Sequence, residues 1–96
     1  MKPFYVYILA SKRNGTLYTG STDDLGNRVW QHKTKAIEGF TAKYGVDKLV
    51  WCEAHDSRES AFTRERRIKE WKRKWKLNLI EASNPDWNDL YETLAH

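Results

Sequence analysis

The sequence predicts an α+β fold, a small three-stranded antiparallel sheet flanked by helices in the order strand, strand, helix, strand, helix, helix. Two segments rich in aromatic and β-branched residues flank Asn14-Gly15, and a third apolar run covers residues 49–52. After residue 56, apolar residues recur at helical spacing. The 96 residues suffice for one domain and not for two, so we expect a single domain over residues 1–96.

The first two strands are expected to form a hairpin, with Asn14-Gly15 as a two-residue turn. That turn places Leu9 opposite Gly20. Because strand side chains alternate between the two faces of a sheet, the same register directs three side chains to one face: Tyr7, Leu9 and Tyr18.

A helix is expected over residues 23–35, after the capping side chains of Ser21-Thr22-Asp23-Asp24. Leu25 and Val29 are four residues apart and mark its inward face, and Arg28 and His32 fall close to them on a helical wheel. Each of these two polar side chains either reaches out to solvent or meets a partner. Residues 36–46 contain two glycines and are expected to form a loop or a short helical turn.

The strongest helical pattern begins at Asp56, which resembles a capping box with Glu59. A break is expected near Arg73. After the turn sequence Asn84-Pro85-Asp86, a final amphipathic helix is expected. The buried stripe of the long pattern is predicted to comprise Ala61, Ile68, Trp71, Trp75 and Leu79.

Glu65 lies inside this apolar arc, whereas Glu59 and Glu70 lie outside it. Burying a carboxylate is costly without compensation, so a salt bridge, a hydrogen-bond network or a metal ion must satisfy it. Tyr7 and Tyr18 have the same two interpretations, as core aromatics or as chemical groups. Together with Arg28 and His32, these residues predict a polar site between the sheet and its helices.

These residues resemble the motifs of the GIY-YIG nucleases. Tyr5-Val6-Tyr7 stands in the place of Gly-Ile-Tyr, and Tyr18-Thr19-Gly20 in the place of Tyr-Ile-Gly. The family's helix arginine matches Arg28, the imidazole one turn later matches His32, and the metal-binding glutamate matches Glu65. The resemblance covers nearly the whole chain and is closest to the small stand-alone bacterial members.

The resemblance implies a metal-dependent DNA endonuclease with one Mg²⁺ or Mn²⁺ ion held by Glu65. Arg28 would contact the scissile phosphate, because its planar fork suits phosphate oxygens better than a lysine does. Tyr7 is the family's candidate general base, and His32 could share the proton. Tyr18 would orient water or phosphate, and RNA is a possible substrate besides DNA.

The net charge of +4 and the pI near 9.3 suit contact with polyanions. We see no module that reads bases, so structure-selective or weakly selective cutting is expected. The alternatives are a solvated basic surface, a binding module with little nuclease activity, and an interaction protein whose partner surface includes Trp30 and Trp87. The residues predicted to bind nucleic acid are Lys33, Lys35, Lys43, Arg66, Lys69 and Arg73.

The single cysteine, Cys52, cannot form an internal disulfide, and with three scattered histidines it offers no structural zinc site. The sequence has neither the apolar run of a signal peptide nor a segment approaching the roughly 18–20 apolar residues of a membrane span. We therefore expect a cytoplasmic protein without zinc and without a membrane partner.

Overall fold

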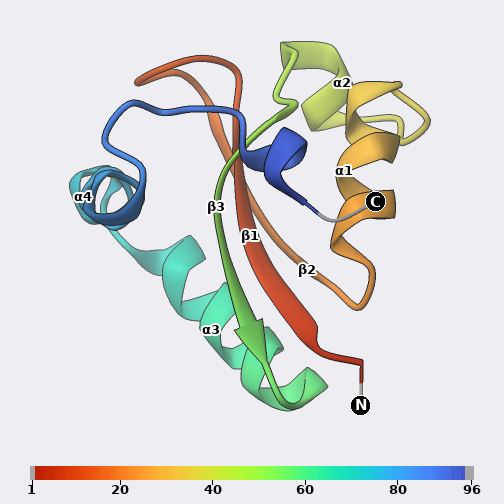
Figure 1. Ribbon diagram of the computed structural model, residues 1–96. Helices are drawn as coiled ribbons and strands as arrows, with labels where there is room; N and C mark the ends of the chain where they lie inside the picture. Colours follow the sequence, from red (N-terminus) through yellow and green to blue (C-terminus); the bar gives the residue numbers. More distant parts are fainter. Residues whose placement is uncertain (1, 95–96) are drawn as a thin grey trace.

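The computed structural model describes residues 2–94 and shows a three-stranded antiparallel sheet with helices on both faces (Figure 1). The strands are β1 (Phe4–Ala10), β2 (Leu17–Thr22) and β3 (Lys48–His55), in the spatial order β2-β1-β3. The helices are α1 (Leu25–Lys33), α2 (Phe40–Tyr44), α3 (Arg58–Glu70), α4 (Arg73–Ser83) and the 3-10 helix η1 (Leu90–Thr93). The predicted α+β class is confirmed, and α2 is the short helical turn that the sequence left open.

The central strand β1 divides the core into two parts. Val6 and Ile8 pack against α3 and α4, on the left of Figure 1. Tyr7 and Leu9 pack on the opposite face with α1 and η1. All four side chains are at most 2% exposed, so β1 contributes to both cores through the simple alternation of a strand.

The predicted hairpin register is wrong by two residues. Leu9 pairs with Tyr18, and Tyr7 pairs with Gly20. The loop is longer than Asn14-Gly15 alone: the Ser11 amide donates to the Thr16 carbonyl at 3.0 Å, and the Gly15 amide to the Lys12 carbonyl at 2.9 Å. A slip of two residues preserves which face each side chain occupies, so Tyr7, Leu9 and Tyr18 share a face as predicted.

Gly20 is required where β2 passes Tyr7. A Cβ atom built on Gly20 would lie 2.6 Å from the Tyr7 hydroxyl oxygen and 2.8 Å from Cζ of the same ring. It would also approach Tyr18 Cε2 to 3.1 Å. The missing side chain therefore leaves the space that the phenol of Tyr7 occupies.

The helices begin at side-chain caps. Asp24 caps α1 by accepting from the Asn27 amide. At α3 the cap is Ser57, which accepts from the Ser60 amide at 3.1 Å, and not Asp56 as predicted. β3 stays paired through His55, so Asp56 lies in the connection between the strand and the Ser57 cap. Within residues 2–94, no helix has the length and the apolar character needed to cross a membrane.

The predicted break in the long helical pattern is confirmed, and it changes the exposure of Trp75. Trp71 and Lys72 have extended backbone angles between α3 and α4. The helical phase is not continuous across such a break. Trp75 is consequently 57% exposed instead of buried, whereas Ile68 before the break and Ile80 after it are fully buried.

The C-terminal segment is held by Asn84 and not by an amphipathic helix, contrary to the prediction. The side-chain Nδ2 of Asn84 donates to the backbone carbonyls of Val50 and Asn88, at 3.1 and 2.9 Å. This turn buries Trp87 to 6% exposure, so Trp87 belongs to the core and not to a partner surface. In the described part of the C-terminal segment, the single turn η1 follows.

We predict that Gly20→Ala lowers the free energy of unfolding by roughly 1–3 kcal/mol, because the added methyl group overpacks the Tyr7 ring. Urea unfolding measures the change. Gly26→Ala is the matched control, since a Cβ at Gly26 meets nothing within 4 Å, and it should leave the stability unchanged or raise it by up to about 1 kcal/mol. Equal stabilities of the two variants would contradict the prediction.

Candidate functional site

Three aromatic rings meet between β1, β2 and α1. The ring centroids of Tyr7 and Tyr18 are 6.4 Å apart, and His32 lies 6.2 Å from Tyr7 and 5.5 Å from Tyr18. The alternation of the two strands places both phenols on the α1 face, and the inward side of α1 supplies the imidazole. The structure therefore brings together three of the residues that the sequence singled out.

The imidazole of His32 is held at both nitrogens. Nδ1 lies 2.9 Å from the hydroxyl oxygen of Thr41, at the start of α2. Nε2 lies 3.4 Å from the hydroxyl oxygen of Tyr7. Both partners are hydroxyl groups, which can donate or accept hydrogen bonds. They therefore orient the ring in either its neutral or its protonated form.

Burial controls the protonation of this cluster. It is the largest cause of a raised pKa at Tyr7, with a further rise from Tyr18 and a smaller opposing effect of Arg28. Burial also lowers the pKa of His32, and the positive charge of Arg28 lowers it further. At neutral pH the Tyr7 phenol keeps its proton and the His32 imidazole is neutral, so the imidazole is the better proton acceptor.

Glu65 lies on the inner side of α3 and is 9% exposed. The Ser21 hydroxyl donates to Oε1 at 2.5 Å, and the Lys69 ammonium lies 2.6 Å from Oε2. The carboxylate is thus satisfied by a hydroxyl from β2 and a lysine one turn along the same helix. The Lys69 side chain is 50% exposed, so its end of the ion pair is in contact with solvent.

The negative charge of Glu65 acts on the ring cluster, since it contributes to the raised pKa of Tyr7. Within residues 2–94, no three Asp, Glu, His or Cys residues converge as a set of metal ligands. A single buried carboxylate with an adjacent hydroxyl suits a cation that keeps most of its water molecules, as Mg²⁺ does. The donors around Glu65 fit such an ion and do not fit a fully protein-enclosed one.

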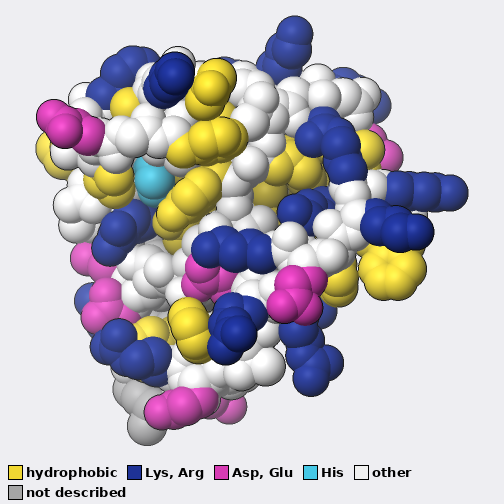
Figure 2. All heavy atoms as spheres, turned by 180° about the vertical axis from the view of Figure 1, so that it is seen from behind, with side chains coloured by type: hydrophobic (Ala, Val, Ile, Leu, Met, Phe, Trp, Pro, Cys, Tyr) yellow, Lys and Arg dark blue, Asp and Glu magenta, His cyan; other side chains and the backbone are white. Residues whose placement is uncertain are grey.

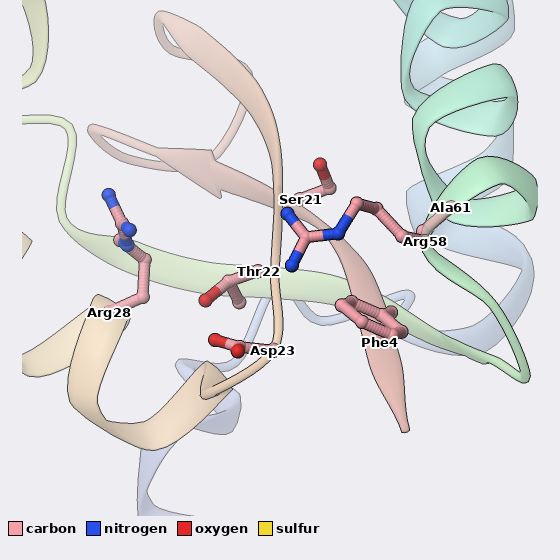
Figure 3. Close-up of a pocket in the computed structure, with 7 residues that line it drawn as sticks. All are labelled: Phe4, Ser21, Thr22, Asp23, Arg28, Arg58 and Ala61. Carbon is pink, nitrogen blue, oxygen red and sulfur yellow. The ribbon is translucent and has the colours of Figure 1, made fainter. Parts of the chain in front are cut away.

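Arg28 projects from α1 and is exposed. It lines a depression beside Ser21 and Asp23, at the end of β2 (Figure 3). Its charge affects the pKa of both Tyr7 and His32. Of the predicted site residues, Arg28 is therefore the one directed to solvent.

Three of the six basic residues predicted to bind nucleic acid form ion pairs or hydrogen bonds within this chain. Lys33 pairs with Asp89, Lys69 pairs with Glu65, and Arg73 donates to the carbonyls of Asn14 and Gly15 at 2.7 and 2.6 Å. The other three are exposed and form no ion pair among the described residues: Lys35, Lys43 and Arg66. Figure 2 shows Lys and Arg side chains distributed around a column of hydrophobic side chains on one face of the molecule.

Sequence reasoning missed Ser21 and Thr41, the hydroxyl partners of Glu65 and His32. Ser21 is 44 residues from Glu65, and only the packing of α3 on β2 brings them together. Strand alternation places Ser21 on the face opposite Tyr18, toward α3, but it does not show that Glu65 meets it there. Thr41 lies in a segment whose helical turn the sequence did not define.

Comparison with known proteins agrees with this arrangement. The model of the GIY-YIG catalytic domain matches residues 3–78. A UPF0213 protein of Clostridium perfringens is 38% identical over 83% of this chain and 85% of its own length. A UPF0213 protein of Staphylococcus saprophyticus is 35% identical over 83% of this chain and 96% of its own length.

A solved structure has the same fold. The solution NMR structure of a UPF0213 protein from Bacillus halodurans superimposes with a TM-score of 0.57 and 28% identity. The match covers 98% of this chain and 99% of that protein. The family match includes all five residues of the predicted site, at positions 7, 18, 28, 32 and 65. This chain belongs to the GIY-YIG catalytic domain family, a family of nucleases.

Proposed function

We propose that this protein is a metal-dependent endonuclease that hydrolyses phosphodiester bonds in DNA. The observation that carries the proposal is Glu65, a carboxylate buried by α3 whose negative charge acts on Tyr7, a member of the ring cluster with Tyr18 and His32. A purely structural acid would gain little from this position, because an ion pair with a half-exposed lysine contributes only about 0–1 kcal/mol. The arrangement is better explained by a cation that Glu65 binds during catalysis.

Glu65 would be the only carboxylate ligand of one Mg²⁺ or Mn²⁺ ion. When bound, the ion supplies charge neutralisation at the phosphate and activation of a water molecule. Ser21 keeps the carboxylate in place through its hydrogen bond to Oε1. Lys69 would release Oε2, which its exposed and flexible side chain permits.

Arg28 would bind the scissile phosphate. Its guanidinium group is exposed beside the end of β2, where a nucleic-acid backbone has access. The planar fork offers two parallel hydrogen bonds to phosphate oxygens, and its permanent charge opposes the negative charge that grows in the transition state. Lysine at this position would keep the charge and lose the fork.

His32 would accept the proton of the attacking water, directly or through Tyr7. The neutral imidazole is available at neutral pH because its pKa is lowered, whereas the raised pKa of Tyr7 keeps that phenol protonated. In the relay, the Tyr7 oxygen would take a proton from the water as its own hydroxyl proton passes to Nε2 of His32, which lies 3.4 Å away. Tyr18, on the other side of the imidazole, would orient water or phosphate.

The substrate proposed is DNA, with RNA as the second possibility. Lys35, Lys43 and Arg66 are exposed cations available to phosphates, and they carry no base-reading geometry. No recognition helix in the described part of the chain stands clear of the sheet to enter a major groove. We therefore propose structure-selective or weakly sequence-selective cutting.

One observation favours a second candidate, a nucleic-acid-binding module with little nuclease activity. The Lys69 ammonium occupies the Glu65 oxygen that a metal ion would use. If Lys69 held that position permanently, the basic surface would bind nucleic acid and the carboxylate would do no chemistry.

Glu65→Gln is expected to reduce cleavage by about 10²-fold or more, because the amide keeps the size of the side chain and loses the charge that binds the metal. Cleavage of labelled single-stranded, duplex and branched DNA with Mg²⁺ or Mn²⁺ measures it. Glu59→Gln is the matched control, since Glu59 is an exposed acid on the same helix. Equal activity of the natural protein and Glu65→Gln would exclude this carboxylate, and binding without cleavage in both would favour the second candidate.

The pH dependence of kcat/KM tests His32. Activity requires the neutral imidazole, so it should be present above the pKa of His32 and lost as the pH falls through that pKa. Because burial and Arg28 lower the pKa, the midpoint should lie below the ordinary histidine value of about 6.5.

His32→Gln should lower the rate by about 10²–10⁴-fold and remove this acid limb. His55→Gln is the control, because His55 lies on β3 with Glu53 and Ser60 as its partners. An acid limb that survives unchanged in His32→Gln would assign the titration to another group.

A further inference from the structure

The depression beside Arg28 has a second arginine on its far wall. Arg28 reaches it from α1 and Arg58 from the first residue of α3, with Ser21, Thr22 and Asp23 between them (Figure 3). We propose that this depression binds a phosphodiester group of a nucleic acid, and that Arg58 is a phosphate ligand opposite Arg28. The proposal rests on the proposed function for its substrate class and assigns a role to a residue outside the family motifs.

Arg58 stands where a cation is electrostatically unfavourable. The N-terminus of a helix carries a partial positive charge, which disfavours a nearby cation by about 0.3–1 kcal/mol. Among residues 2–94, no carboxylate forms an ion pair with Arg58 to compensate for this position. An anion in the depression would benefit both from the guanidinium group and from the helix N-terminus behind it.

Phe4 holds the guanidinium group of Arg58 in position. The guanidinium carbon lies 5.1 Å from the centroid of the Phe4 ring, within the range of a cation–π contact. This contact orients the group and leaves its hydrogen-bond donors directed away from the ring face. The Phe4 contact therefore favours one position of an otherwise exposed side chain.

Two other arginines of the chain bind acceptor groups of the protein, unlike the pair at the depression. Arg64 pairs with Glu53, and Arg73 binds backbone carbonyls of the hairpin loop. Arg28 and Arg58 form neither kind of contact within the described part of the chain. Two guanidinium groups face the same depression with one carboxylate, Asp23, so its lining carries a net positive charge.

The size and location of the depression suit a phosphate group. Its volume is about 160 Å³, below the roughly 300–1,000 Å³ of pockets that enclose drug-sized ligands. Ser21 lines the depression and also donates to Glu65 Oε1 at 2.5 Å. A phosphate bound between the two arginines would therefore lie one hydroxyl group away from the carboxylate proposed to hold the metal.

The test is equilibrium binding of a fluorescein-labelled single-stranded DNA to the full chain in EDTA, where metal-dependent cleavage is prevented, over a series of salt concentrations. Each phosphate contact contributes about 0.7 to the slope of log K against log salt for single strands. Arg58→Gln, which keeps most of the stem over Phe4, should reduce the slope by about this amount. Arg58→Lys, which keeps the charge, should retain most of the slope.

Arg67→Gln is the matched control. Arg67 is exposed on the same helix, and nine residues from Arg58 correspond to half a turn of the helical wheel, so it projects from the opposite side. For Arg67→Gln, the slope of log K against log salt should equal that of the natural chain. Asp23→Asn should tighten binding, because it removes the one negative charge of the lining. Urea unfolding of each variant establishes that the fold is retained.

The outcomes separate this inference from the proposed function. Metal-dependent cleavage with an unchanged slope in Arg58→Gln would overturn the inference and leave the nuclease function standing. A reduced slope in Arg58→Gln, without cleavage by the natural chain, would support the phosphate site and count against the nuclease function. Equal slopes in Arg58→Gln and Arg67→Gln, or an absence of salt-dependent binding, would also overturn the inference.

Discussion

The structure depends on the burial of β1 on both faces. This strand carries the apolar side chains Val6 and Ile8 toward α3 and α4, and Tyr7 and Leu9 toward α1. Because it pairs with β2 on one side and β3 on the other, its backbone is also satisfied on both edges. Pairing on both edges and packing on both faces hold this strand, and Tyr7, which is 2% exposed, is part of that packing.

The polar site exists because the core leaves room for polar groups and supplies hydrogen-bond partners for them. Gly20 leaves room for the Tyr7 hydroxyl, and Thr41 and Ser21 supply hydroxyl groups where a purely apolar core would leave polar atoms without partners. Among the described residues, no buried side-chain nitrogen or oxygen lacks a hydrogen-bond partner. The fold therefore tolerates an imidazole and a carboxylate close to its centre.

Much of the architecture was predictable because strand and helix periodicities are local properties. The face of Tyr7 and Tyr18 was right although their register was wrong, since a slip of two residues preserves alternation. The exposure of Trp75 was missed because the sequence predicted a break near Arg73 but not the change in helical phase across Trp71 and Lys72. Two arrangements of distant segments are revealed only by the packed structure: the hydrogen bond between Ser21 and Glu65, and the depression lined by both Arg28 and Arg58.

The contact between Glu65 and Lys69 has a consequence for the resting protein. Burying a lone carboxylate costs desolvation free energy, and Lys69 supplies a counter-charge from the same helix. Binding of the proposed divalent cation would then exchange one positive group for another, so the local charge would rise by about one unit instead of two. With Lys69 as counter-charge the buried carboxylate is compensated without a metal ion, unlike in small domains whose folding is driven by metal binding.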